Sequence, residues 1–206
     1  MISKRPRGTE RHWTPAQHEL FAPALPEGLE YADGFVSADE EAALLAAITD
    51  LPLAEARYRG YTARRRILSF GTRYDFDDDR LQPADPLPGF LLPLRQRAAA
   101  WAGVAPEALA AALVAEYRPG TPLGWHRDVP DYELVVGVSL GAPARMRLRP
   151  YPPGQAEHSD VISLDLAPRS AYILRGAARW EWQHSIAPTR ALRRSITFRT
   201  RRPFTR

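Results

Sequence analysis

Short β-like segments recur through the second half of this 206-residue chain, and no other feature restricts the fold as strongly. Each segment is rich in apolar or β-branched residues, and Gly or Pro separates it from the next. The segments cover about residues 113–117, 133–140, 145–149, 161–166, 171–174, 180–186 and 195–200. Many short strands at this spacing predict an antiparallel sandwich or barrel.

The first half of the chain predicts helices that support this β-core. Ser37 is a good N-cap residue, and Glu40 completes a capping box for a helix over about 38–49. The residues on the predicted apolar face of this helix are Ala42, Leu45 and Ile48. A second helix is expected over about 93–102 and a short one over about 106–112. The fold class is therefore α+β.

The chain is expected to form one domain behind an N-terminal arm. Residues 1–25 are rich in proline and charge and show no period, so we interpret them as an arm before a domain over 26–206. A strand and turn are expected near 28–36, and a loop over 75–88. Between these segments, residues 58–76 are aromatic and arginine-rich, which predicts strands or extended loops.

Composition excludes several kinds of site. The chain has no cysteine, so disulfides and thiolate metal sites are excluded, and a bound metal must use nitrogen and oxygen ligands. No run of about 18 apolar residues occurs, so we expect no membrane span. The first residues are charged and no apolar segment follows them, so a secretory signal is not expected. We therefore expect a cytoplasmic protein, and a monomer.

Basic residues exceed acidic ones. The formal net charge is +4 and the pI is about 9.7. Of the 28 basic residues, only Lys4 is lysine and the others are arginine. Codon bias in a GC-rich genome accounts for much of this usage, and a surface that attracts phosphate backbones is compatible with it. Basicity alone is a weak indication of nucleic-acid binding.

Two histidines and one carboxylate stand out among the predicted strands. His126 and Asp128 form a His-x-Asp pair, and residues i and i+2 of a strand point to the same face, so both can reach one ion. His184 is far along the chain from Asp128, so it must reach the same ion from another strand. Two histidines and a carboxylate suit ferrous iron and leave positions open for a co-substrate and oxygen.

Two arginines follow the second histidine. Arg193 and Arg199 bracket a short β-like run. An arginine can hold a carboxylate by a two-pronged, charge-assisted contact, so one placed here can hold a dicarboxylic acid beside the metal. The combination predicts an oxygenase that depends on iron(II) and 2-oxoglutarate.

The chain resembles the AlkB-like family of iron(II)/2-oxoglutarate-dependent dioxygenases over about residues 28–201. Six stretches carry the resemblance, and the most specific is Arg-x-Ser-x-Thr-Phe-Arg at 193–199. The other five are Gly28-Leu29-x-Tyr31 with Phe35, Arg65-Arg66 with Phe70-Gly71-x-x-Tyr74, Tyr117-Arg118-Pro119-Gly120, His126-x-Asp128 with Val138-Ser139-Leu140-Gly141, and Trp182-x-His184-Ser185-Ile186.

The resemblance implies a double-stranded β-helix, or jelly-roll, core with N-terminal supporting helices. It implies that Fe(2+) is bound by His126, Asp128 and His184, and that 2-oxoglutarate and O2 are consumed. The typical reaction of the family is the oxidative demethylation of an alkylated base, which releases formaldehyde. The expected partner is therefore alkylated DNA or RNA.

The resemblance also implies a co-substrate site. Arg193 matches the arginine that holds the distal carboxylate of 2-oxoglutarate, and Arg199 matches the arginine near its iron-chelating end. Tyr117 matches a tyrosine that hydrogen-bonds the co-substrate, and Ser195 is expected to add a contact. Members often carry Asn two residues before this tyrosine, where this chain has Ala115.

Substrate contacts are expected from the aromatic and arginine-rich segment. It precedes the β-core as the family's nucleotide-recognition lid does, so we place a lid over about 55–80, with Tyr61, Arg65 and Tyr74 as substrate-binding candidates. Bases outside a duplex stack on aromatic side chains, and arginines take phosphates. The alternative interpretation is that Tyr61 and Phe70 are core residues and that Arg64 to Arg66 form a solvated edge that discourages strand pairing. Trp125 either walls the pocket or packs beneath it.

One departure from the family bears on the substrate. The founding type has an acidic residue shortly after the metal-binding aspartate, where it touches the base. In this chain Pro130 falls at that place and Asp131 follows. Two other functions stay open: the same oxygenase core acting on a protein or small molecule, and a β-barrel that binds nucleic acid without catalysis.

Overall fold

Two antiparallel sheets face each other and form a jelly roll in the computed structural model, which describes residues 24–58, 60–153 and 161–203. The large sheet has the order β1 (Leu29–Ala32), β11 (Ala171–Leu174), β8 (Tyr132–Gly141), β13 (Arg193–Arg201), β6 (Ala111–Tyr117), β3 (Tyr61–Phe70) and β2 (Ala54–Tyr58). The small sheet has the order β10 (Ile162–Leu166), β9 (Ala144–Pro150), β12 (Trp182–Ile186) and β7 (Leu123–His126). The predicted jelly-roll core is confirmed, whereas the predicted arm lies almost wholly outside the described residues.

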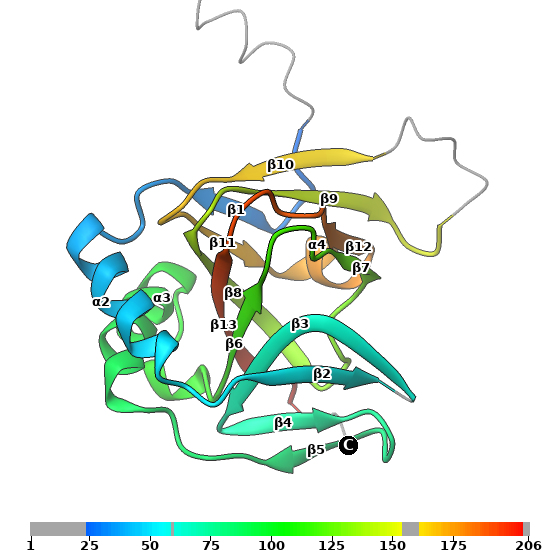
Figure 1. The fold of residues 1–206 in the computed structure, drawn as a ribbon. Helices are drawn as coiled ribbons and strands as arrows, with labels where there is room; N and C mark the ends of the chain where they lie inside the picture. Colours follow the sequence, from blue (N-terminus) through cyan, green and yellow to red (C-terminus); the bar gives the residue numbers. More distant parts are fainter. Residues whose placement is uncertain (1–23, 59, 154–160, 204–206) are drawn as a thin grey trace, which may run out of the picture.

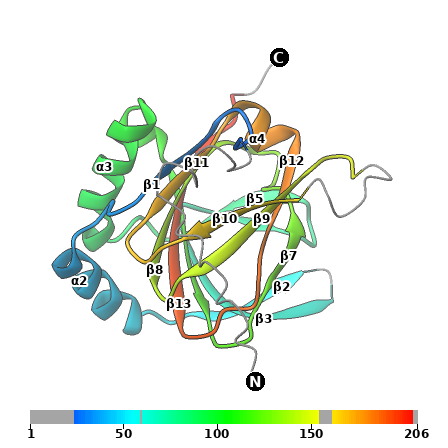
Figure 2. The same cartoon turned by 90° about the horizontal axis from the view of Figure 1, so that it is seen from above.

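Helices cover the outer face of the large sheet. These helices are α2 (Ala38–Thr49) and α3 (Leu92–Ala102), with 3-10 turns at η1 (Gly89–Leu91) and η2 (Pro106–Ala108). The short helix α4 (Gly176–Trp180) instead contributes Ala178 to the apolar cluster between the two sheets. Figures 1 and 2 both show α2 and α3 together on one side of the sandwich. Apolar side chains of both helices join those of β6, β8 and β13 in one core cluster, so the helices anchor the sheet. No helix in the described part of the chain is long and apolar enough to cross a membrane.

The predicted start of α2 is confirmed, and its predicted apolar face is confirmed in part, because Ile48 is buried and Leu45 packs against the core. The Glu40 backbone N–H donates to Ser37 Oγ (3.1 Å), and Ser37 N–H donates to Glu40 Oε2 (2.8 Å). The residues buried against the sheet are Leu44 and Ile48, whereas Ala42 is exposed. Leucine and isoleucine bury more apolar surface than alanine, so the helix turns its larger side chains toward the sheet.

A second apolar cluster fills part of the space between the two sheets. It joins Val135 of β8 and Leu174 of β11 to Met146 and Leu148 of β9 and Ile186 of β12. The rest of the space between the sheets is not filled by apolar side chains, and the functional cavity described below lies there.

Three local predictions were wrong. The predicted loop over 75–88 contains β5 (Arg80–Pro83), which pairs with β4 (Thr72–Asp75) as a two-stranded sheet. The predicted helix over 106–112 is only the η2 turn, because β6 begins at Ala111 and pairs with β13 and β3. The predicted strand over 180–186 begins only at Trp182, after α4. In each case the outcome depends on a long-range strand pairing or packing contact that local propensity does not record.

Candidate active site

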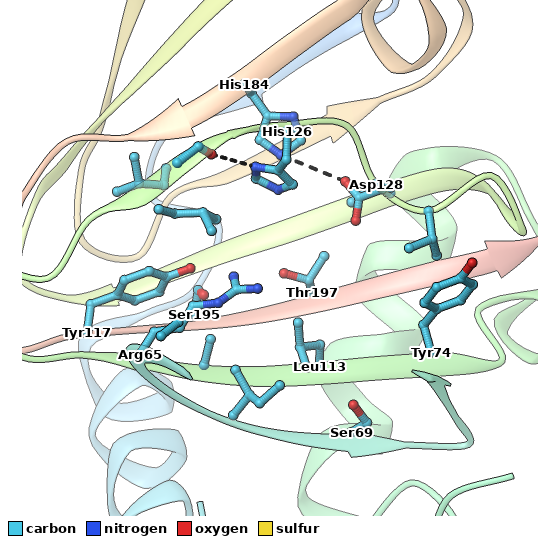
Figure 3. Close-up of a pocket in the computed structure, with 18 of the residues that line it drawn as sticks. Arg65, Ser69, Tyr74, Leu113, Tyr117, His126, Asp128, His184, Ser195 and Thr197 are labelled. Atoms are coloured by element: carbon cyan, nitrogen blue, oxygen red, sulfur yellow. Dashed lines mark hydrogen bonds and ion pairs between the residues drawn. The ribbon is translucent and has the colours of Figure 1, made fainter. Parts of the chain in front are cut away.

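Three side chains meet where the two sheets diverge. His126 and His184 are cross-strand neighbours in β7 and β12, with ring centroids 4.2 Å apart. Asp128 lies beyond the end of β7 rather than within the strand as predicted, and its Oδ2 is 3.7 Å from His184 Nε2. One nitrogen or oxygen atom from each residue lies within 4.8 Å of the others. Figure 3 shows the three side chains converging at one end of the cavity.

Second partners orient two of these side chains. His126 Nδ1 lies 2.9 Å from the Gly124 carbonyl oxygen, so this nitrogen donates and Nε2 stays available as a ligand. Arg199 Nε donates to Asp128 Oδ1 (2.9 Å), and Arg199 Nη2 forms an ion pair with the same oxygen at 2.8 Å, which leaves Oδ2 directed toward the histidines. Each of the three residues can therefore offer one lone pair to a metal ion.

The electrostatics of the cluster favour metal-binding protonation states. Burial lowers the pKa of His184 to about 3, with a further contribution from His126, and burial also lowers the pKa of His126. Burial opposes ionisation of Asp128 most strongly, but Arg199, the two histidines and Arg179 together outweigh it and hold the pKa of this carboxyl below its usual range. Two neutral imidazoles and one carboxylate are the forms that bind a divalent cation.

A cavity of about 860 Å³ opens in front of these residues. Alternate residues of β13 line it, so Arg193, Ser195, Thr197 and Arg199 all face inward. Arg193 is only 1% exposed, and its Nε donates to Ser139 Oγ at 3.1 Å. A buried guanidinium with donors left over is suited to an anionic guest.

The Tyr117 phenol lies between two guanidinium groups. Tyr117 is opposite Arg193 in the β6–β13 register, and the Arg193 guanidinium carbon is 5.0 Å from the tyrosine ring centroid. Burial raises the pKa of Tyr117, but the charges of Arg65 and Arg193 and their hydrogen bonds to the phenol lower it below its ordinary value overall. The side chains expected at the co-substrate site therefore do converge.

The predicted lid segment forms the opposite wall of the cavity. Arg65 of β3 reaches in beside Tyr117, and one of its Nη atoms donates to the Tyr58 hydroxyl. Tyr74 of β4 lines the same wall and packs edge-on against Phe76, with ring centroids 5.0 Å apart. The side chain of Tyr61 lies outside the described residues. The role of the segment as a recognition lid stays a prediction.

Comparison with known proteins places the chain in a family. Residues 28–202 match the family described as the 2OG-Fe(II) oxygenase superfamily. The chain belongs to this superfamily. Within it the chain is an AlkB-like dioxygenase, and its cofactors are Fe(2+), 2-oxoglutarate and O2.

Curated relatives of this AlkB-like oxygenase are longer than the chain. A tRNA (carboxymethyluridine(34)-5-O)-methyltransferase alkbh8 from Xenopus tropicalis is 27% identical over 175 residues, covering 82% of this chain and 27% of that protein. An alkylated DNA repair protein ALKBH8 homolog from Arabidopsis thaliana is 30% identical over 180 residues, covering 77% of this chain and 50% of that protein. The chain thus spans about a quarter to a half of these relatives.

Solved structures agree on the fold. The structure of OsALKBH1 superposes with a TM-score of 0.66 at 17% identity, covering 86% of this chain and all of that one. A Pseudomonas putida prolyl-4-hydroxylase superposes with a TM-score of 0.55 at 18% identity, covering 85% of this chain and 93% of that one. Sequence identity this low supports the jelly-roll fold alone.

Trp125 of the AlkB-like oxygenase borders the cavity, but its ring packs elsewhere. It precedes His126 on β7, so the pleat directs its side chain to the opposite face of the small sheet. There, the guanidinium carbons of Arg149 and Arg147 lie 4.4 and 5.2 Å from its ring. These contacts favour the interpretation that Trp125 packs beneath the pocket.

Sequence reasoning missed three residues around the oxygenase site. Ser139 accepts from Arg193, and it was noticed only as part of a motif. Tyr172 lines the cavity over Gly137, where a Cβ would lie 2.2 Å from the tyrosine ring, and burial raises the pKa of Tyr172 to about 12. Buried Arg179 donates to the carbonyl oxygens of two residues just after Asp128, Val129 and Tyr132, at 2.7 Å each. No local pattern in the sequence signalled any of the three.

Proposed function

We propose that this chain oxidatively dealkylates alkylated nucleobases in DNA or RNA. The observation that carries the proposal is the convergence of His126, Asp128 and His184 at one end of a cavity of about 860 Å³ whose other wall is basic and aromatic. Such a cavity is large enough for a flipped base together with a small co-substrate.

The three converging side chains are the proposed iron ligands. Each offers one lone pair, the imidazoles are neutral, and the carboxylate is held ionised by Arg199. A face of two histidines and one carboxylate leaves the other coordination positions of ferrous iron open. The donor chemistry of the site therefore fits the metal that the superfamily uses.

The proposed binding site for 2-oxoglutarate lies along β13. Arg193 is buried and would hold the distal carboxylate, with Tyr117 and Ser195 beside it. Arg199 bonds Asp128 at the metal end of the same strand, and we assign it to the end of the co-substrate that chelates iron. The two arginines lie on the same face of β13 and both line the cavity, so we assign them to the two carboxylates of the diacid.

The loaded centre supplies the oxidation of a C–H bond, with one oxygen atom of O2 entering succinate and the other entering the alkyl carbon as 2-oxoglutarate loses CO2. When that carbon is bonded to nitrogen, the product is a hemiaminal, which loses formaldehyde and leaves N–H on the base. The side chains of the protein bind and orient the reactants and keep water out of the cavity. Tyr74, Arg65 and Tyr61 are the proposed base contacts, and Trp125 acts by supporting the strand that carries His126.

The names of the relatives support nucleic acid as the substrate polymer. One is named for a modified uridine of tRNA and another for alkylated DNA repair. Both are longer than this chain, so their activities come to it only as part of this proposal. The expected monomeric state and cytoplasmic location stay predictions.

Turnover with defined substrates tests the function. Release of succinate that requires iron and 2-oxoglutarate, and that is stimulated by methylated oligonucleotide together with formaldehyde release, is the expected result. Stimulation by peptides or small molecules, with none by methylated oligonucleotides, would instead favour a protein or small-molecule oxygenase. Nucleic-acid binding with no succinate release would favour the non-catalytic alternative.

A further inference from the structure

The cavity carries an unbalanced positive charge. Among the described residues that line it, the only carboxylate is Asp128, which is a proposed iron ligand already paired with Arg199. Six arginines line the same cavity: Arg64, Arg65, Arg73, Arg127, Arg193 and Arg199. Loading the centre does not change the balance, because the two charges of ferrous iron match the two carboxylates of 2-oxoglutarate.

The other carboxylates nearby do not reach the cavity. Glu116 is buried on β6, but the pleat directs it to the opposite face of the large sheet, where Arg66 and Arg194 bond it at 3.0 and 3.2 Å. Asp131 does not line the cavity. Asp79 lines an adjoining hollow that shares Tyr74, Phe76, Arg127 and Asp128 with the cavity. In the described part of the chain, no carboxylate besides Asp128 lines the cavity itself.

One half-buried arginine has a donor left for the substrate. Arg199 is engaged by Asp128, and Arg193 donates to Ser139 at the proposed co-substrate site. Arg65 bonds the Tyr58 hydroxyl through Nη2 and also hydrogen-bonds the Tyr117 phenol, but its buried Nε has no hydrogen-bond partner among the described residues. A buried unpaired donor is costly, so a guest that supplies an acceptor is favoured over one that supplies another donor.

We propose that this cavity selects neutral or anionic alkylated bases that present a carbonyl or carboxylate oxygen to Arg65, and that it discriminates against bases made cationic by alkylation. The proposal rests on the proposed function and adds the charge class of its substrate. Alkylation at N1 of adenine or N3 of cytosine gives a cation with an amino group at the adjacent carbon. Alkylation at N1 of guanine or N3 of uracil gives a neutral ring with a carbonyl at the same place.

Aromatic rings act in the opposite direction but do not reverse this preference. Ring faces attract cations, and Tyr58, Tyr74 and Phe76 all line the cavity. The Tyr58 ring already has the Arg65 guanidinium carbon 5.6 Å from its centroid, and its other contact is with Phe76 at 4.7 Å between ring centroids. A cationic base would therefore approach rings that already lie close to a fixed positive charge.

Two matched pairs of substrates test the proposal. Four single-stranded oligonucleotides of one sequence carry 1-methylguanine or 1-methyladenine, and 3-methyluracil or 3-methylcytosine, at one position. Loss of the methyl group is followed by mass spectrometry, and kcat/KM is measured for each. We expect the neutral member of each pair to exceed the cationic member by about tenfold or more. Equal or faster turnover of the cationic members overturns the proposal.

Substitutions at Arg65 test whether this residue causes the discrimination between neutral and cationic bases. Arg65→Met should reduce the neutral-to-cationic ratio toward one, whereas Arg57→Met, on the exposed part of β2 and outside the cavity lining, should keep it. If Arg65→Met does not fold, Arg65→Lys retains the charge and should retain the ratio. A ratio that persists in Arg65→Met overturns the assignment. A higher KM for 2-oxoglutarate with an unchanged ratio does so as well, since it places Arg65 at the co-substrate.

Failure of the proposed function gives a different result. If none of the four bases is oxidised, dealkylation itself is wrong. The charge preference is then read from equilibrium binding of the same four oligonucleotides, with Mn(II) in place of iron and 2-oxoglutarate present. Tighter binding of the neutral members supports the preference, and equal binding overturns it.

Discussion

The two sides of the cavity differ in how their residues are held. His126, His184 and Arg193 lie on strands that are hydrogen-bonded within the two sheets of the sandwich, and each has a partner that fixes its orientation or its strand. The opposite wall comes from the β2–β3 and β4–β5 hairpins. There, the β3–β6 register runs from Arg66 to Phe70, and Arg65 lies just outside it, in the stretch where the β2–β3 register is irregular.

We infer from this difference that the first side serves the reaction and the second side serves recognition of the substrate. A side built from central strands holds ligands in one geometry, which metal and co-substrate binding require. A side built from edge hairpins has fewer supporting contacts and can vary with the substrate. We therefore expect changes on the first side to impair binding of the metal or the co-substrate, and changes on the second to affect only the use of the substrate.

The largest expected effect comes from Asp128→Ala on the iron side. Loss of the carboxylate removes one proposed ligand and leaves Arg199 unpaired in a buried site, so succinate release should fall by more than about 100-fold. The matched control is Asp165→Ala, which removes an exposed carboxylate that is also paired with an arginine, Arg145. Its turnover should equal that of the unmodified chain. Equal losses of succinate release in the two variants would show that the loss is not specific to the iron side of the cavity.

Arg193→Lys should give the next largest effect, on the co-substrate. A lysine keeps the charge but loses the two-pronged contact, so the KM for 2-oxoglutarate should rise by about 10- to 100-fold, while kcat at saturation stays close to normal. Because Arg193 is buried, thermal unfolding should be measured alongside the kinetics. An unchanged apparent affinity in a folded variant would show that the co-substrate binds elsewhere.

Tyr74→Ala should produce a smaller effect of a different kind. Loss of one stacking surface should lower kcat/KM for a methylated oligonucleotide by about tenfold. Succinate released without substrate should be unchanged, because the iron side is untouched, and this rate is the internal control. A parallel fall of both rates would mean that the hairpin wall supports the metal site, so the two sides would not be separable.

The last prediction concerns the stability of the metal-free protein and not its turnover. The pKa of His184 is lowered to about 3 in the folded state from an ordinary value of 6.5, so below pH 6.5 the unfolded chain takes up a proton that the folded chain does not. The free energy of unfolding should fall as pH decreases from 6.5 toward 3, by up to about 1.4 kcal/mol per pH unit for this residue. Denaturant unfolding of the chain and of His184→Gln should show a shallower pH slope in the variant. Equal slopes would contradict the buried, neutral state of this histidine.

The parts that sequence predicted well are those with a local signal. The capping box of Ser37 and Glu40 needs only neighbouring residues, and it predicted the start of α2. The order of the histidines and Asp128, followed by Arg193, also pointed to one site, because the family resemblance supplied the strand arrangement that brings them together.

The parts that sequence did not predict depend on long-range contacts. Strand β5 exists because it pairs with β4, and the composition of its segment favoured a loop. Tyr172 faces the cavity because it is paired with Gly137 across β11 and β8, a register that no local pattern reveals. The orientation of Trp125 follows from the side of β7 on which His126 faces the cavity, and the sequence left both interpretations open.

The most direct measurement is an anaerobic titration of the metal-free chain with Fe(II) in the presence of 2-oxoglutarate, monitored by the visible charge-transfer absorption of the complex. The account predicts one iron per chain, loss of the absorption in His126→Ala, and a higher 2-oxoglutarate requirement with the same final absorption in Arg193→Lys. Iron binding of unchanged stoichiometry and absorption in His126→Ala would contradict it, because iron would then be held outside the cavity between the two sheets.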